Sequence, residues 1–178
     1  FQFFPVCHSI PDAAGIALKS PVGLLVHTGD FKFDDNPTLG NPIDLEYLSN
    51  LSSNTNLILC SDSTYAEKDG FTGSESTLEE KLKQIISRSE GRVLIATFSS
   101  LLSRIQQIIT ISSILGRRVS VVGRSMNRNL KVALDLGYLA DPQNTVIPLR
   151  DSKKLPDRKV LLITTGAQGE SSSAMGLI

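Results

Sequence analysis

The chain has 178 residues, a length that fits one ordinary domain or parts of two. Apolar residues make up 40% and charged residues 20%, so the chain can form a core and does not belong to the disordered class. Its 18 basic and 18 acidic residues cancel, which excludes a protein that holds nucleic acid by overall charge alone.

Two strands are predicted in the first third of the chain. The run VGLLVHT at residues 22–28 is apolar and β-branched and predicts a buried strand. The short apolar run NLILC at residues 56–60 predicts a second buried strand. Residues 34–42 are turn formers and predict a loop between the two. The chain then turns polar and glycine-containing, which predicts a domain boundary at about residue 73.

Helices and strands alternate in the remainder of the chain. Ser76 and Glu79 form a capping-box pattern at a helix start, and Ser99 or Ser100, then Ser125, are the predicted caps of two further helices. Strands are predicted over residues 92–97, 118–123, 145–149 and 159–164. Because these strands are continuously apolar and alternate with helices, we expect an α/β fold with a parallel sheet flanked by helices on both faces.

The cysteines, the apolar runs and the two ends of the chain bear on its cellular location and on whether it is part of a longer protein. The two cysteines, Cys7 and Cys60, do not make a disulfide framework, which favours a reducing, cytoplasmic location. No apolar run approaches the roughly 20 residues of a membrane-spanning helix, and no signal peptide pattern opens the chain. The chain starts FQFF without an initiator methionine and ends GLI without a cap or polar tail, so we expect a segment of a longer protein.

Small polar residues gather where predicted strands end, and open α/β sheets bind ligands at the carboxyl ends of their strands. These groups are Ser61–Thr64, Thr97–Ser100, Gly123–Ser125 and Thr164–Glu170. One interpretation is a phosphate-bearing ligand held by helix amides and hydroxyls; the other, more frequent in proteins, is simple helix capping. Neither G-x-G-x-x-G after a strand nor a Walker loop is present, so a nucleotide cofactor is not supported.

The two histidines are His8 and His27. Asp30 follows His8 by 22 positions, after a strong strand and a glycine, and a carboxylate at a strand end is a typical metal ligand. A lone histidine is more often structural than ligating. We expect His27, inside the apolar strand, to pack or to support a ligand, and Cys7 to lie in the core.

The motifs taken together resemble ribonuclease J, the RNA-degrading branch of the metallo-β-lactamase superfamily that carries a β-CASP insertion. They are HSIPDA from residue 8, VHTGDFKFD from 26, SDSTYAE from 61, ATFSS from 96, RIQQI from 104, VVGRSM from 121 and TTGAQGE from 164. They occur in the family's order over nearly the whole chain. The resemblance implies a zinc-dependent enzyme that hydrolyses RNA phosphodiesters as a 5′-to-3′ exonuclease and as an endonuclease.

The resemblance also implies roles for single residues. His8 matches a histidine that binds one zinc, Asp30 the aspartate that bridges both zincs, and Asp62 an acidic residue that orients a catalytic-site histidine. Two ions that share a carboxylate lower the pKa of a bridging water and clamp the scissile phosphate. The family's H-x-H-x-D-H motif would lie before residue 1 and its late histidines after residue 178. Because two ligands cannot fill a zinc coordination sphere, we expect the segment alone to be inactive.

In domain terms the resemblance implies a partial metallo-β-lactamase domain of the αββα type over residues 1–72 and a β-CASP domain over residues 73–178. Tyr65, Ala167 and Ser171 stand where the family usually has Asn, Ser and Pro. The resemblance implies that these positions bear on RNA contacts and not on metal ligation. Family members commonly form dimers or tetramers, so a homo-oligomer is an expectation for the longer protein.

Basic residues concentrate in the second half of the chain: Arg92, Arg104, Arg117, Arg118, Arg124, Arg128 and Lys131. We expect a local basic face there, with RNA contacts from Ser99, Ser100, Arg124, Ser125 and Arg128. The equally weighted alternative is that these arginines are solvated or paired with Glu79, Glu80, Glu90 and Asp135. A second functional hypothesis is a non-catalytic RNA-binding or assembly module of a degenerate β-CASP protein. An intact H-x-H-x-D-H motif upstream would favour the enzyme.

Overall fold

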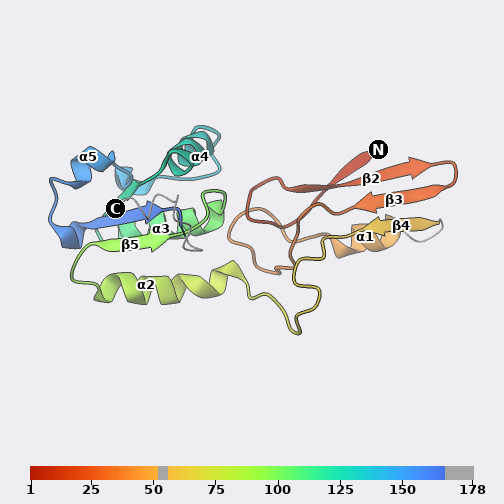
Figure 1. The fold of residues 1–178 in the computed structure, drawn as a ribbon, viewed down its shortest axis with the longest axis horizontal. Coiled ribbons are helices and arrows are strands. Elements are labelled where there is room, and N and C mark those ends of the chain that lie inside the picture. Colours follow the sequence, from red (N-terminus) through yellow and green to blue (C-terminus); the bar gives the residue numbers. More distant parts are fainter. Residues whose placement is uncertain (52–55, 167–178) are drawn as a thin grey trace. The chain divides into compact units, whose positions relative to one another are not determined.

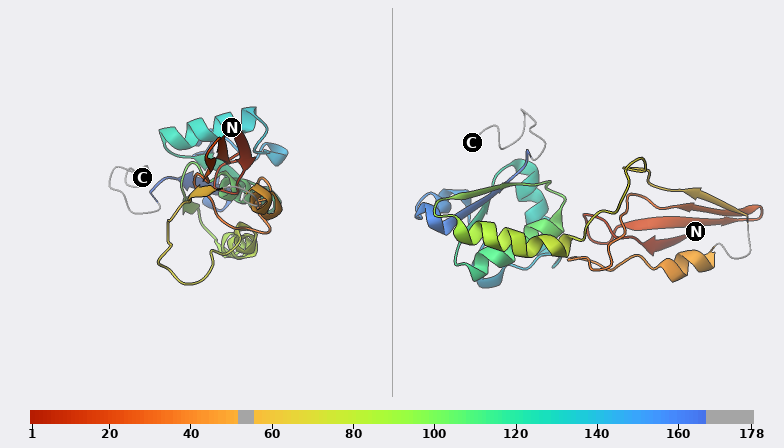
Figure 2. Two further views of the ribbon diagram at one scale, coloured as in Figure 1. Left: turned by 90° about the vertical axis from the view of Figure 1, so that its right-hand side faces the viewer. Right: turned by 90° about the horizontal axis from the view of Figure 1, so that it is seen from below.

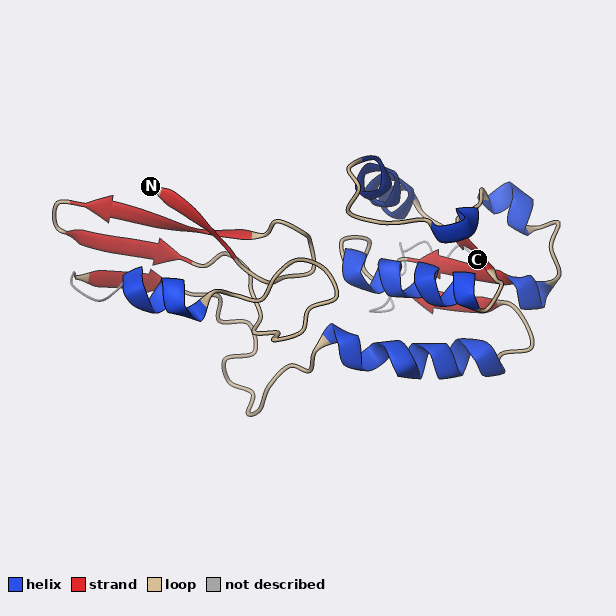
Figure 3. Cartoon of the chain, turned by 180° about the vertical axis from the view of Figure 1, so that it is seen from behind, coloured by secondary structure: helices blue, strands red, loops and turns tan. Residues whose placement is uncertain are grey.

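The computed structural model describes residues 1–51 and 56–166, and the chain divides into two compact units (Figure 1). Unit 1 is Phe1–Ser76 and unit 2 is Thr77–Ile178. Unit 1 is built mainly of strands and loops, whereas unit 2 combines a parallel sheet with helices (Figure 3).

Unit 1 contains a four-stranded sheet of order β1-β2-β3-β4 and the helix α1. Its elements are β1 (Gln2–Pro5), β2 (Ala14–Ser20), β3 (Gly23–His27), α1 (Leu45–Leu51) and β4 (Leu57–Cys60). β2 runs antiparallel to both β1 and β3, and β4 runs parallel to β3. The strand predicted over 22–28 is confirmed as β3, whereas β1 and β2 were not predicted.

One face of this sheet packs against α1 (Figure 2). Phe4, Ala17, Leu24 and Val26 point to that face and are 2–7% exposed. Tyr47 of α1 packs against them, with its ring centroid 6.0 Å from that of Phe4. Burial of these side chains stabilises unit 1, by about 25 cal/mol for each Å² of apolar surface removed from water.

The opposite face of the sheet carries exposed apolar side chains. Phe3, Leu18 and Ile58 are 64%, 41% and 63% exposed. β4 forms where a strand was predicted over residues 56–60, but the prediction that it is buried is wrong. β4 lies at the edge of the sheet, and the described residues of the chain do not cover it, because an apolar run specifies a strand but not the layer that packs on it.

Unit 2 is built around a three-stranded parallel sheet of order β5-β7-β6. Its strands are β5 (Val93–Ala96), β6 (Arg118–Val121) and β7 (Val160–Thr164), and its helices are α2 (Glu79–Arg88), α3 (Leu102–Ile114), α4 (Arg124–Asp135) and α5 (Leu149–Ser152). The short 3₁₀ helices are η1 (Glu75–Leu78), η2 (Pro142–Asn144) and η3 (Asp157–Lys159). The division between the two units falls within η1. In Figure 1, α2 lies on one side of the strands and α4 on the other. The α/β class with a parallel, helix-flanked sheet is therefore confirmed.

The buried core of unit 2 explains why helices lie on both sides of its parallel sheet. All five residues of β7, the central strand, are buried, as a strand covered on both faces requires. Ile105, Ile108 and Ile109 of α3 and Met126 of α4 are fully buried. In the described part of the chain, no helix is both long enough and apolar enough to cross a membrane.

The predicted serine caps are wrong. α2 follows the turn η1, and Leu78, Leu101 and Gly123 occupy the N-cap positions of α2, α3 and α4 without a side-chain cap hydrogen bond. The strand predicted over 145–149 is reduced to one bridge between Val119 and Val146, because Pro148 lacks an amide hydrogen and α5 begins immediately after it.

Arg117 is a buried cation in unit 2, with 6% of its surface exposed. Its guanidinium donates hydrogen bonds to the carbonyls of Gly91 at 2.9 Å, Ile86 at 3.3 Å and Val160 at 3.4 Å, and to that of Ser89. It thereby joins the end of α2 to the start of β7. The sequence-based placement of Arg117 on a basic surface is wrong.

Candidate functional site

The three residues of unit 1 that were predicted as site residues follow three strands that run in the same direction. β1, β3 and β4 share a direction because β2 is antiparallel to the first two and β4 is parallel to β3. His8 follows β1, Asp30 follows β3 and Asp62 follows β4. Their loops therefore begin at one edge of the sheet, which is where α/β sheets place ligand-binding loops.

Hydrogen bonds tie these three loops together. The amide of Lys32 donates to the carbonyl of Cys7 at 2.9 Å, which joins the Asp30 loop to the His8 loop. The amide of Thr28 donates to the carbonyl of Cys60 at 3.0 Å. The amide of Asp62 in turn donates to the Thr28 hydroxyl at 3.0 Å. The structure thus brings the loops of the predicted residues into one cluster.

The Asp62 carboxylate is held in its ionised form by its surroundings. The amide of Thr64 donates to it at 2.8 Å, and this hydrogen bond is the main reason that its pKa lies below the ordinary value. The Thr64 hydroxyl and the amide of Phe31 act in the same direction, as does the positive charge of His8 when its ring is protonated. Asp62 is therefore an anion that interacts with both neighbouring loops.

His8 and Asp30 retain free ligand atoms. Nδ1 of the half-buried His8 lies 3.2 Å from the Ser9 hydroxyl, so Nε2 is the nitrogen left for another contact. Asp30 is exposed, and its carboxylate makes no hydrogen bond or ion pair with any residue in the ranges 1–51 and 56–166. Within those ranges no three His, Cys, Asp or Glu side chains gather to hold a metal ion. The described residues alone thus form part of a metal site at most.

Cys7 and His27 were predicted to have roles other than binding metal, and only the prediction for Cys7 is confirmed. Cys7 is 4% exposed and lies in the core of unit 1, as predicted. Burial raises the pKa of its thiol, against the effect of Lys32, so it remains protonated. His27 is exposed at the end of β3, which makes the packing role wrong; its Nδ1 accepts a hydrogen bond from the amide of Gly29 at 3.0 Å.

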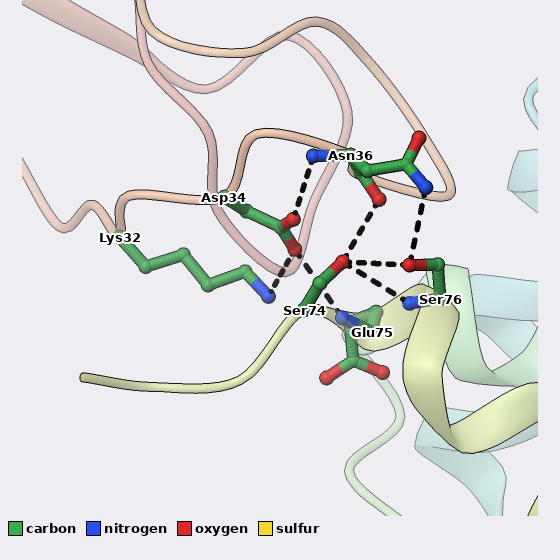
Figure 4. A network of polar contacts seen from close by, with 6 residues as sticks. All are labelled: Lys32, Asp34, Asn36, Ser74, Glu75 and Ser76. Carbon is green, nitrogen blue, oxygen red and sulfur yellow. Dashed lines mark hydrogen bonds and ion pairs between the residues drawn. The ribbon is translucent and has the colours of Figure 1, made fainter.

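Asp34 is the centre of a polar network that follows directly on the Asp30 loop (Figure 4). Its carboxylate lies 2.9 Å from the Lys32 ammonium and accepts hydrogen bonds from the amides of Asn36 at 3.0 Å and Glu75 at 3.3 Å. The Ser74 hydroxyl donates to the carbonyl of Asn36 at 2.9 Å. The network fixes residues 32–36 to residues 74–76 within unit 1.

The polar network favours the ionised form of Asp34. Burial acts to raise the pKa of the carboxyl, but contacts with the Ser74 hydroxyl, Lys32 and the two amides outweigh it and hold the pKa at about 2. The turn formers at residues 34–42 predicted a loop that contains Asp34, but not this role. Its partner Glu75 lies 41 residues away along the chain, so no local pattern announces the contact.

The predicted nucleic-acid contacts lie in unit 2, at the carboxyl end of its sheet. Ser99 and Ser100 occupy the turn between β5 and α3, and Ser125 lies in the first turn of α4. The side-chain amide of Asn129 donates to the carbonyl of Ser99 at 3.0 Å and contacts its hydroxyl at 3.2 Å. This contact joins the turn after β5 to α4. Asn129 was not singled out from the sequence, because nothing in the helical pattern distinguishes it.

The predicted basic face is smaller than expected. Arg92 pairs with Asp157 at 2.8 Å, and Arg118 donates to the carbonyls of Gln143 and Asn144 at 3.0 and 2.7 Å. Arg124 and Arg128 are exposed and have no hydrogen bond or ion pair among the residues that the structure describes. The ion pairs weighed as the alternative, with Glu79, Glu80, Glu90 and Asp135, are also absent from this part of the chain. Most of the predicted site at 164–170 lies outside the described residues.

Comparisons with known proteins give matches over half or nearly all of the chain. A family model described as the ribonuclease J β-CASP domain matches residues 90–178. Among curated proteins, ribonuclease J of Mycobacterium tuberculosis is 45% identical over 175 residues, and that of Corynebacterium glutamicum is 42% identical over 175 residues. Each match covers 98% of this chain but only 31% and 24% of the relative. Ribonuclease J of Thermus thermophilus is 40% identical over 174 residues.

A solved structure shares the fold. The crystal structure of a protein of unknown function from Enterococcus faecalis matches with a TM-score of 0.58 and 15% identity, over 90% of this chain and 40% of that one. At this level of identity the match concerns the fold alone. The chain spans between about a quarter and a third of the length of the curated relatives named above.

Proposed function

This chain belongs to the ribonuclease J family, and from that premise we propose that it is part of a zinc-dependent hydrolase of RNA phosphodiesters, acting as a 5′-to-3′ exonuclease and as an endonuclease. One observation carries the proposal. The Asp30 carboxylate is exposed and without a partner among the described residues, while its loop is tied on both sides to the loops of His8 and Asp62. A carboxylate held in place but left uncompensated is suited to bind a cation.

In this proposal His8 and Asp30 are metal ligands, with Nε2 of His8 and the carboxylate oxygens of Asp30 as donor atoms. A zinc pair, when bound, supplies a water of lowered pKa and polarises the phosphate oxygens. Two side chains leave such a centre incomplete, so residues 1–178 alone are proposed to be inactive. Asp62 does not bind metal; it is an anion that orients a neighbouring histidine.

The domain assignment is also a proposal. Residues 1–72 are assigned to a partial metallo-β-lactamase domain and residues 73–178 to the β-CASP domain. The compact units divide after Ser76, and the family model begins at residue 90. RNA is proposed to contact Ser99, Ser100, Arg124, Ser125 and Arg128, and the full protein is proposed to be cytoplasmic and a homo-oligomer.

Hydrolysis of RNA by the full-length protein tests the proposal. We expect Asp30→Ala to abolish cleavage and zinc retention while the protein stays folded, because the Asp30 carboxylate makes no hydrogen bond or ion pair with the described residues. Asp35→Ala, an exposed carboxylate five residues away, is the matched control and should cleave normally. A folded Asp30→Ala protein that cleaves RNA at the normal rate would remove Asp30 from the metal centre.

The second candidate is a non-catalytic RNA-binding or assembly module. Arg124 and Arg128 of unit 2 lack acidic partners among the described residues, which favours RNA binding whether the protein is an enzyme or a module. The same assay separates the two candidates. RNA binding without zinc retention or hydrolysis in the full-length protein would support the module.

A further inference from the structure

Phe98 is a half-exposed aromatic residue on a rigid turn. Its side chain is 50% exposed and lies directly after β5, at the carboxyl end of the parallel sheet. The preceding amide, of Thr97, donates to the carbonyl of Thr164 at 2.9 Å, and the Phe98 carbonyl accepts from Leu101 at 3.1 Å. Asn129 holds the next residue, Ser99, through two contacts. An aromatic ring on so firmly held a turn loses little conformational freedom when a ligand packs on it.

The helix α4, which Asn129 joins to this turn, carries exposed cations. Between Glu90 and Asp135 the sequence carries seven cationic residues, named above as the basic residues of the second half, and no acidic residue. Arg128 directly precedes Asn129, the residue that binds the Phe98 turn, and Arg124 lies one helical turn before it. Both guanidinium groups are exposed and unpaired within the described residues. An exposed ring on the turn and unpaired cations on the helix that Asn129 joins to it match the two parts of a nucleotide, its base and its phosphate.

We propose that Phe98 is the surface on which a base of single-stranded RNA stacks, while Arg124 and Arg128 contact the adjoining phosphates. The inference rests on the proposed RNA function and adds a contact residue that the sequence analysis did not name. The strand is single because the bases of a duplex have no free face for the ring. Stacking on an aromatic ring tolerates any base, so this contact sets affinity rather than sequence preference.

The chain contains no tryptophan, which allows a direct test. Phe98→Trp places a single fluorescent indole at the proposed surface of the 178-residue chain. Ile85→Trp, on α2 at a side chain 62% exposed, is the matched control. We expect a single-stranded RNA oligonucleotide to quench Phe98→Trp fluorescence but not Ile85→Trp, and an abasic strand of the same length and charge to quench neither.

Affinity gives the second measurement. Phe98→Leu keeps an apolar side chain without a ring face, and circular dichroism verifies its fold. We expect it to bind RNA about 10-fold more weakly, with an unchanged dependence on salt, because stacking involves no counterion release. If RNA binds with a salt dependence that Arg124 and Arg128 control, yet Phe98→Trp is not quenched and Phe98→Leu binds normally, the stacking role is wrong and the proposed RNA function stands. Failure of the unmodified chain and the full-length protein to bind RNA at all would overturn both.

Discussion

The ammonium of Lys32 lies 2.9 Å from a carboxylate oxygen of Asp34 whose side chain is only 1% exposed. Lys32 is thus bound at both ends, since its amide also donates to Cys7 in the loop of His8. The Lys32–Asp34 pair links the proposed metal-binding loops to the polar network that holds residues 74–76 (Figure 4). Its removal should therefore affect both stability and the order of those loops.

Asp34→Asn is expected to lower the free energy of unfolding of unit 1 by about 3 kcal/mol, because it leaves two partly buried amides and the Lys32 charge without their anionic partner. Urea unfolding measures this loss, and faster hydrogen exchange at the amides of Asn36 and Glu75 locates it. Asp35→Asn, the exposed neighbour, is expected to change stability by less than about 0.5 kcal/mol. Equal stability of the two variants would show that the network contributes nothing.

Acid should weaken unit 1 through the same residue. The pKa of Asp34 is about 2 in the fold, below its ordinary value of 3.8, so the fold favours the ionised form. This contribution is complete above pH 3.8 and is lost as the pH falls from 3.8 towards 2, by about 2 kcal/mol in total. Urea titrations between pH 5 and 2 measure the slope, which should be smaller in Asp34→Asn. A variant with the undiminished slope would assign the acid sensitivity to other carboxylates.

The strands of unit 2 could be predicted because continuous apolar runs bounded by polar residues are local signals. β7, predicted over 159–164 and observed over Val160–Thr164, is the clearest case. β1 and β2 could not be found in this way, because their pairing with each other decides which residues face inward: Phe4 is buried and Phe3 exposed. Ser99 and Ser100 before α3, and Ser125 in the first turn of α4, do not act as caps because Leu101 and Gly123 occupy the N-cap positions.

The candidate site was only partly predictable, because the sequence shows local patterns but not contacts between distant residues. His8, Asp30 and Asp62 belong to motifs that can be recognised from the sequence, and their placement after strands is local information. The contacts of Asp34 with Glu75 and of Asn129 with Ser99 join residues 41 and 30 positions apart, which no local pattern reveals. Arg117 was misplaced because arginine is seldom buried, and only the surrounding carbonyls make its burial favourable.

The 178-residue chain is expected to bind zinc weakly. Only His8 and Asp30 are proposed ligands, and zinc in proteins normally takes three or four. Metal analysis after dialysis against a mild chelator should find well under one zinc per chain, with no further fall in the double variant His8→Ala/Asp30→Ala. Stoichiometric zinc that the double variant loses would show that the centre is more complete within this chain than proposed.

Arg117→Lys is expected to destabilise unit 2 by about 3 kcal/mol. A lysine ammonium cannot reach the separate carbonyls of Gly91, Ile86 and Val160 that the planar guanidinium spans, so buried acceptors lose their donors. Thermal unfolding measures the effect. Arg92→Lys, which alters an exposed ion pair with Asp157, is the control and should cost less than about 1 kcal/mol. Similar losses in both variants would contradict the structural role of Arg117.

Arg124 and Arg128 are expected to determine how RNA binding by the chain depends on salt. Each phosphate neutralised on a single strand contributes about −0.7 to the slope of log affinity against log salt concentration. Arg124→Ala/Arg128→Ala should therefore make the slope shallower by about 1.4 and weaken binding most at low salt. Arg88→Ala/Arg158→Ala removes the same charge from exposed positions elsewhere in unit 2 and should leave the slope unchanged. Because the net charge of the two double variants is identical, a difference between them reports local contact rather than the overall field. Equal slopes for both would place the RNA path away from the start of α4.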